Sequence, residues 1–153
     1  MGLDISVYQN IRLLSTDVKE DRIRIENGEI DFTAYVIHES WEPRIKNLKN
    51  DGEYSGDCVY SEFSSGYISY SHFRSQLDNL SPLTGKGTPF NEVIDFADNE
   101  GCIDWETSAK LYRDFVDFHD KAMKTFDKAL IWKYETMMES FRLGAQNGVV
   151  KFH

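Results

Sequence analysis

The residues best suited to chemistry lie in one short stretch of the chain, residues 63–74. This stretch holds Tyr and Phe rings, several Ser hydroxyls, Gly66, His72 and Arg74, and it contains neither Asp nor Glu. Hydroxyls and backbone N–H groups around a Gly turn can donate hydrogen bonds, Arg pairs with phosphate or carboxylate, and Tyr can stack on a planar group. The stretch therefore fits a site for an anionic or planar ligand. It also fits a strand that ends in a Gly turn and leads into a helix with core aromatic residues.

The elements that position this stretch begin with β-structure. Residues 3–8 alternate between apolar and polar side chains, the period of a half-buried strand. Asn27 and Gly28 separate two further strand-like runs, and both residue types tolerate the positive φ of a type I′ turn. We therefore expect Ile23–Ile25 and Ile30–Val36 to pair as a hairpin.

The second half of the chain predicts helices. Ser69 or Ser71 could cap a helix that runs to about Leu80, and Asp104 could cap a long helical region. That region is either one helix or two helices that break near residues 125–127. Two apolar stripes at three- and four-residue spacing predict its buried face: Trp105, Ala109, Tyr112, Val116, His119, Met123 and Phe126, then Leu130, Tyr134, Met137, Phe141 and Ala145.

The order of these elements predicts a single α+β domain over residues 1–153. We expect a small antiparallel sheet with an N-terminal hairpin, three to four helices packed on one face, and a short C-terminal strand at Val149–Phe152. Residues 42–57 are hydrophilic and predict an irregular loop before a strand at residues 58–63.

Composition limits the partners of the chain. Its formal net charge is −9, with 26 acidic and 17 basic residues, which argues against direct binding to nucleic acid or to an anionic membrane. No apolar run approaches the ~20 residues of a membrane span, and no signal peptide is evident at the start of the sequence. Cys58 and Cys102 are expected to be reduced and buried. These features predict a soluble, cytoplasmic protein.

Four segments resemble a family of uncharacterised proteins encoded by phages, prophages and some bacteria. They are Met1-Gly-Leu-Asp-Ile5, Phe63-x-x-Gly66-Tyr67-x-x-Tyr70-x-x-Phe73-Arg74, Pro89-Phe-x-x-Val-Ile-x-Phe96-Ala-Asp98-x-Glu100-Gly101 and Ala145-x-x-Gly148-Val-Val-x-Phe152-His153. The resemblance implies a small accessory protein of a mobile element that acts on host defence. It implies no established activity.

Enzymatic chemistry has one candidate group. Asp95, Asp98, Glu100 and Asp104 lie between two predicted helices, where paired carboxylates could shift each other's pKa, and Asp98 with Glu100 could serve a small hydrolase. The same residues could instead be helix caps and a solvated loop. The Cys and His residues lack the spacing of a metal site, and no nucleotide-binding glycine motif is present, so no metal or cofactor is predicted.

Binding is the function that we favour from the sequence. The predicted ligand site combines three residues of the first helix with residues from two of the other segments shared with the phage family. Arg74 would pair with a phosphate or carboxylate, the Tyr rings would stack on or edge a planar group, and an acidic residue would accept from the ligand or hold Arg74. The ligand would be small and anionic or nucleotide-like, as are signals of bacterial immunity. The site residues are Tyr67, Tyr70, Arg74, Asp98, Glu100 and His153.

The alternative is an acidic protein that inhibits a host enzyme. It would present carboxylates to the basic, nucleic-acid-binding groove of a host protein. An oligomer is possible in either case. The acidic residues of this surface would be Asp17, Glu20, Asp21, Glu26 and Glu29.

Overall fold

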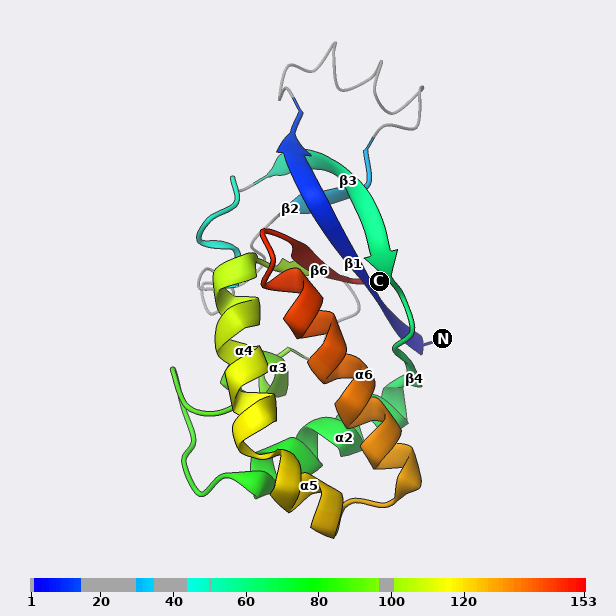
Figure 1. Cartoon of the computed structure of the whole chain (residues 1–153), viewed down its shortest axis with the longest axis vertical. Helices are drawn as coiled ribbons and strands as arrows, with labels where there is room; N and C mark the ends of the chain where they lie inside the picture. Colours follow the sequence, from blue (N-terminus) through cyan, green and yellow to red (C-terminus); the bar gives the residue numbers. More distant parts are fainter. Residues whose placement is uncertain (1, 15–29, 35–43, 50, 97–100) are drawn as a thin grey trace.

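The computed structural model describes residues 2–14, 30–34, 44–49, 51–96 and 101–153. It is an α+β fold in which helices cover one face of a twisted antiparallel sheet, as predicted (Figure 1). The described elements are β1 (Gly2–Leu13), β2 (Phe32–Ala34), β3 (Gly52–Tyr60), β4 (Ser64–Gly66), α2 (Tyr67–Leu80), α3 (Asn91–Ile94), β5 (Gly101–Ile103), α4 (Trp105–Asp117), α5 (His119–Thr125), α6 (Lys128–Gly144) and β6 (Val149–Phe152).

The sheet has six strands in the order β2-β3-β1-β6-β5, with β4 paired to the start of β1. The long strand β1 organises it, because β1 pairs antiparallel with β3, β4 and β6 at different points along its length. The predicted C-terminal strand, β6 (Val149–Phe152), lies inside the sheet between β1 and β5. Gly148 permits its approach to β1, since a Cβ at this position would lie 2.5 Å from the carbonyl oxygen of Tyr8.

The alternation seen in the sequence of β1 separates two cores. Leu3, Ile5 and Val7 are fully buried against the helices, together with Phe152 of β6. Tyr8 belongs to a smaller cluster, which includes Phe32, Ala34, Ile45, Leu48, Tyr54, Cys102 and Val149.

The N-terminal hairpin prediction is only partly within the described residues. Ile23–Ile25 and the Asn27-Gly28 turn lie outside them. Phe32–Ala34 does form a strand, and it pairs with residues 52–54 of β3. The prediction that residues 42–57 form a loop is wrong from Gly52 onward, because β3 begins there.

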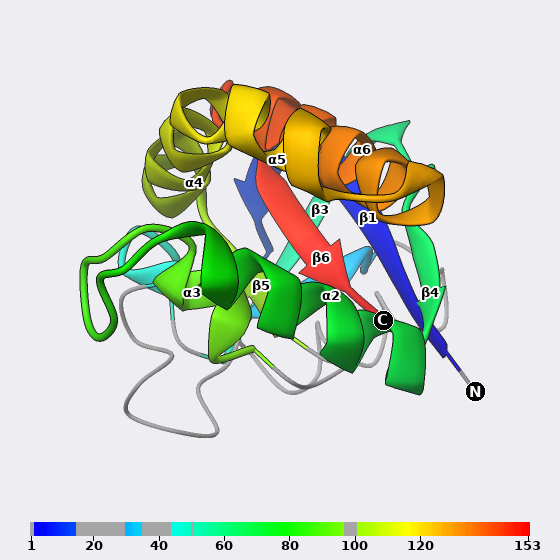
Figure 2. The ribbon, with the colours of Figure 1, turned by 90° about the horizontal axis from the view of Figure 1, so that it is seen from below.

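The long helical region breaks twice. One break is at residues 126–127, as predicted, where the Asp127 side chain accepts a hydrogen bond from the backbone N–H of Leu130 at 2.9 Å. The other is at Phe118, between α4 and α5, and was not predicted. The layer of α4, α5 and α6 lies across the core from α2 and α3 (Figure 2).

Candidate functional site

Tyr70, one of the two tyrosines of the predicted site, is a core residue with one internal hydrogen bond. It lies on the inner face of α2 with Phe73, Leu77 and Leu80, is 1% exposed, and donates from its hydroxyl to the carbonyl oxygen of Phe96 at 2.8 Å. Burial raises the pKa of this hydroxyl, so it remains a neutral donor. Tyr70 therefore positions the chain near residue 96 and offers little ring surface to a ligand.

Arg74 lies one turn further along α2 and reaches the same segment. Its Nη1 donates to the carbonyl oxygen of Ile94 at 2.6 Å, and its guanidinium carbon lies 5.3 Å from the centre of the Tyr70 ring. Its Nε is buried, and no hydrogen-bond acceptor lies beside it in the part of the chain that the structure describes. The side chain is thus oriented by one carbonyl and one ring, and part of its donor capacity is unused.

The three sequence segments of the predicted site converge at Phe96. The Phe96 ring lies 4.5 Å, centre to centre, from the Phe152 ring, while its carbonyl accepts from Tyr70. Gly101 pairs with Phe152 across β5 and β6. Asp98 and Glu100 lie outside the described residues. Of their described neighbours, Phe96 contacts both α2 and β6, and Gly101 pairs with β6.

His153 follows β6 directly, and its side chain lies on the opposite face of the sheet from Phe152. The backbone N–H and carbonyl of His153 pair with Asp4, and its Nε2 lies 2.8 Å from the Oγ of Ser6. Ser6 Oγ lies 3.0 Å from Ser61 Oγ, which donates to the Ile5 carbonyl at 3.2 Å. If Nε2 carries a proton, each contact in this series of hydrogen bonds, from His153 through Ser6 and Ser61 to the Ile5 carbonyl, has one donor and one acceptor. His153 therefore lies apart from Tyr70 and Arg74, and its bonds tie the end of β6 to β1.

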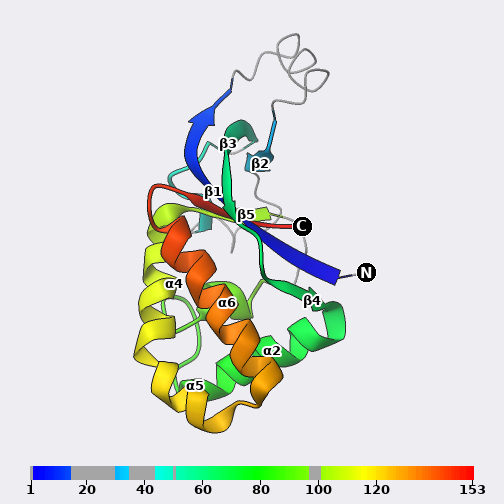
Figure 3. The ribbon, with the colours of Figure 1, turned by 45° about the vertical axis from the view of Figure 1, so that its right-hand side comes forward.

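Tyr67 opens α2 and is half-buried, between the exposed residues Gly66 and Ile68. An open hollow of about 770 Å³ is lined by Gly66, Tyr67, Ile68, Ser69 and His72. Ile68 is 90% exposed. The predicted Ser69 or Ser71 cap is wrong: the helix begins at Tyr67, with Gly66 as N-cap and no side-chain cap bond. The helix starts earlier because β4 turns into it directly (Figure 3).

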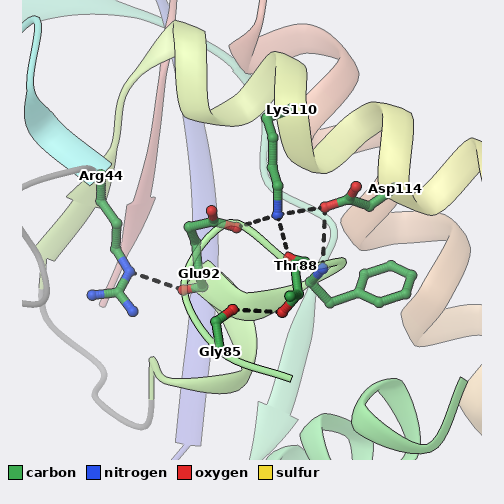
Figure 4. Close-up of polar contacts among 7 residues, drawn as sticks. Arg44, Gly85, Thr88, Glu92, Lys110 and Asp114 are labelled. Carbon is green, nitrogen blue, oxygen red and sulfur yellow. Dashed lines mark hydrogen bonds and ion pairs between the residues drawn. The ribbon is translucent and has the colours of Figure 1, made fainter. Parts of the chain in front are cut away.

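A second polar cluster was not predicted from the sequence. Lys110 of α4 donates from Nζ to the Thr88 carbonyl at 2.6 Å, to Glu92 Oε2 at 2.7 Å and to Asp114 Oδ2 at 2.8 Å (Figure 4). Asp114 also accepts from the backbone N–H of Phe90, whose φ is +62°. The one sequence signal was the i, i+4 spacing of Lys110 and Asp114.

Arg44 reaches the same segment from another direction. It is 1% exposed and donates from Nε to the Glu92 carbonyl at 2.9 Å (Figure 4). Its guanidinium carbon lies 5.0 Å from the centre of the Phe96 ring. Burial lowers the pKa of Arg44, while Asp95 and Glu92 oppose that shift. Lys110 and Arg44 hold residues 88–96 in place and thereby set the position of the Ile94 and Phe96 carbonyls that meet α2.

Neither a metal cluster nor a membrane-spanning helix is found among the described residues. No three His, Cys, Asp or Glu side chains there could hold a metal ion, and no helix there is long and apolar enough to cross a bilayer. Cys102 is buried as predicted, whereas Cys58 is exposed, contrary to the prediction.

No protein-family model, curated protein or solved structure matches this chain.

Proposed function

We propose that the protein is a phage-type accessory protein that acts by binding, and that Arg74 anchors a small anionic or nucleotide-like ligand. One observation carries the proposal. The guanidinium of Arg74 is oriented by Ile94 and Tyr70, yet its Nε is buried and has no hydrogen-bond acceptor among the described residues.

The unused donor has an energetic consequence. A buried donor of a charged group without an acceptor costs on the order of 1–3 kcal/mol or more, and an incoming acceptor removes that cost. Nε and Nη2 form one edge of the guanidinium, the edge that a carboxylate or phosphate takes with two parallel hydrogen bonds. Because Nη1 donates to the Ile94 carbonyl, Nε and Nη2 are the pair of donors that a carboxylate or phosphate would bind.

The surroundings of Arg74 support a planar group beside the anion. One face of the guanidinium lies against the Tyr70 ring, and in this proposal the base of the ligand stacks on the other face. Asp98 and Glu100 stay in the proposal as acceptors for an amino or hydroxyl group of the ligand. A protein that sequesters a nucleotide-like signal of host immunity in this way needs affinity and no catalysis.

A second function, inhibition of a basic host protein by the acidic surface, is favoured by a different observation. Tyr70 and Arg74 both donate to backbone carbonyls, so part of the polar character of residues 63–74 serves the fold. The net charge of −9 would then be the recognition element. The acidic residues predicted for it, at positions 17, 20, 21, 26 and 29, lie outside the described residues. No described contact favours the hydrolase alternative.

Calorimetric titration with a nucleoside triphosphate, a cyclic dinucleotide and inorganic phosphate tests the ligand proposal. We expect at least one probe to bind, and Arg74→Gln to weaken it by roughly tenfold or more, the equivalent of about 1.4 kcal/mol. Arg113→Gln, which changes an exposed Arg of α4, is the matched control and should bind as the unmodified protein does.

Two outcomes would overturn the ligand proposal. One is that no probe binds, and the other is that Arg74→Gln binds with unchanged affinity. Native mass spectrometry of the protein from infected cells then separates the two functions, because a retained small molecule supports the first and a captured basic host protein supports the second.

A further inference from the structure

The exposed start of α2 has a feature that the ligand proposal does not use. Ile68 is 90% exposed and is itself one of the residues that line the open hollow, together with Tyr67 and His72. A large apolar side chain this exposed, next to a concave surface, is typical of an interaction site. A projection and a recess thus occur together on one face.

The charge of this face indicates its partner. Residues 63–74 contain no Asp or Glu in a chain of net charge −9. Two copies of such a chain repel each other, and the repulsion is smallest where neither copy presents carboxylates. A basic partner would instead find no complementary charge here. Exposed carboxylates lie around this face: Glu62 immediately precedes the stretch, Asp4 pairs with Ser64 across β1 and β4, and Asp78 lies further along α2.

The strand that leads into α2 adds a second feature. Within the described residues β4 pairs only with β1, and Ser64 and Gly66 are exposed (Figure 3). An edge strand of this kind can pair with the same strand of another copy. A twofold axis beside β4 would set the two β4 strands antiparallel and direct each Ile68 towards the hollow of the other copy.

We infer that this face, made of β4 and residues 67–72 of α2, joins two copies of the chain. A twofold contact uses the same surface on both partners, so that surface must fit a copy of itself. The exposed Ile68 and the hollow that it helps to line can meet their counterparts on a second copy in this way. Tyr67 then belongs to the interface. Arg74 lies two residues beyond this face, and its guanidinium contacts the Ile94 carbonyl and the Tyr70 ring instead. The inference does not rest on the ligand proposal.

Sedimentation equilibrium over a range of protein concentrations tests the inference. We expect the unmodified protein to be a dimer, and Ile68→Lys to weaken the dimer by roughly tenfold or more, as loss of a central interface residue does. Leu83→Lys is the matched control, because Leu83 is also exposed, at 61%, but lies in the loop after α2. It should leave the dimer intact.

Salt gives an independent measurement. If the interface is the part of the surface without carboxylates, salt screens the remaining repulsion and the dimer becomes tighter as salt rises. A monomer at every concentration, a dimer that Ile68→Lys does not weaken, or a dimer that salt weakens would each overturn the inference. Circular dichroism checks that Ile68→Lys folds, and Ile68→Ser is the second variant.

The two proposals fail separately. Ile68→Lys should retain the affinity for the nucleotide probe, whereas Arg74→Gln should retain the dimer. A variant that loses both properties while remaining folded would show that the two faces are one site, and it would overturn the assignment of this face to a second copy alone.

Discussion

Two of the cations that contact residues 88–96, Lys110 and Arg74, differ in how fully they are paired. Lys110 of α4 directs its ammonium to one carbonyl and two carboxylates, so its three hydrogens all have acceptors (Figure 4). Arg74 of α2 contacts one carbonyl and one ring, and its Nε has no acceptor among the described residues. The paired cation is explained by the fold alone. The underused cation is the one to which a binding role can be assigned.

The largest effect should come from breaking the paired cation. Lys110→Met leaves Glu92 and Asp114 without their counter-ion, in side chains that are only 13% and 14% exposed. Removing one partner of a buried ion pair costs about 3–5 kcal/mol, and partial exposure reduces this to about 2–3 kcal/mol here. Denaturant titration measures the loss. Lys124→Met, at an exposed position of α5, is the control. A loss below about 0.5 kcal/mol would mean that solvent replaces the ammonium at no cost.

Tyr70→Phe should have a smaller effect. It removes the hydroxyl that donates to Phe96 but keeps the buried ring, so the loss is that of one internal hydrogen bond, about 1 kcal/mol. Equilibrium unfolding in urea measures it. If the variant is as stable as the unmodified protein, then the hydrogen bond does not position residue 96.

Arg74→Gln should destabilise the protein by less than about 1 kcal/mol. The variant loses one hydrogen bond to a carbonyl, but it also removes a buried donor that has no acceptor, and these two terms oppose each other. Thermal and denaturant unfolding in the absence of ligand give the value. A loss as large as that of Lys110→Met would remove the contrast between the two cations and make Arg74 a structural residue.

The sequence predicted those parts of the molecule whose local pattern agrees with their packing. The helix that ends at Leu80, the cap at Asp104 and the strand at Val149–Phe152 all follow from spacing or from one capping residue. The stripe on α4 was predicted less well, because Val116 is 49% exposed while Leu111, which is not on the predicted stripe, is fully buried. Tyr112 and Val116 flank the true core face, so a wide apolar stripe gives its direction only approximately.

For the candidate site, the sequence predicted which segments come together. It did not predict which atoms in those segments contact each other. Sequence order placed Tyr70, Phe96 and Phe152 in segments that the structure brings together. Which donors would be used internally depends on the positions of the Ile94 and Phe96 carbonyls. Arg44 and Lys110 hold the segment that carries them, and both are distant in sequence. The spacing of residues along the sequence does not indicate contacts between residues that are so far apart in the chain. The direction of the His153 side chain likewise follows from β6 pairing with β1, which only the fold reveals.

The smallest predicted effect concerns His153, whose side chain contacts neither cation. Burial lowers its pKa, Lys151 adds to this shift and Asp4 opposes it. The unfolded chain, with an ordinary pKa of about 6.5, therefore binds a proton more readily than the folded chain as pH falls below that value. Stability should then decline with falling pH through this window. Because the side chain is exposed, screening keeps the contribution below about 0.5 kcal/mol. His153→Gln can still donate to Ser6, so it should match the unmodified protein at pH 8 and exceed it slightly at pH 5. Identical pH dependence of unfolding in the two proteins would show that the imidazole is as free to protonate in the folded state as in the unfolded one.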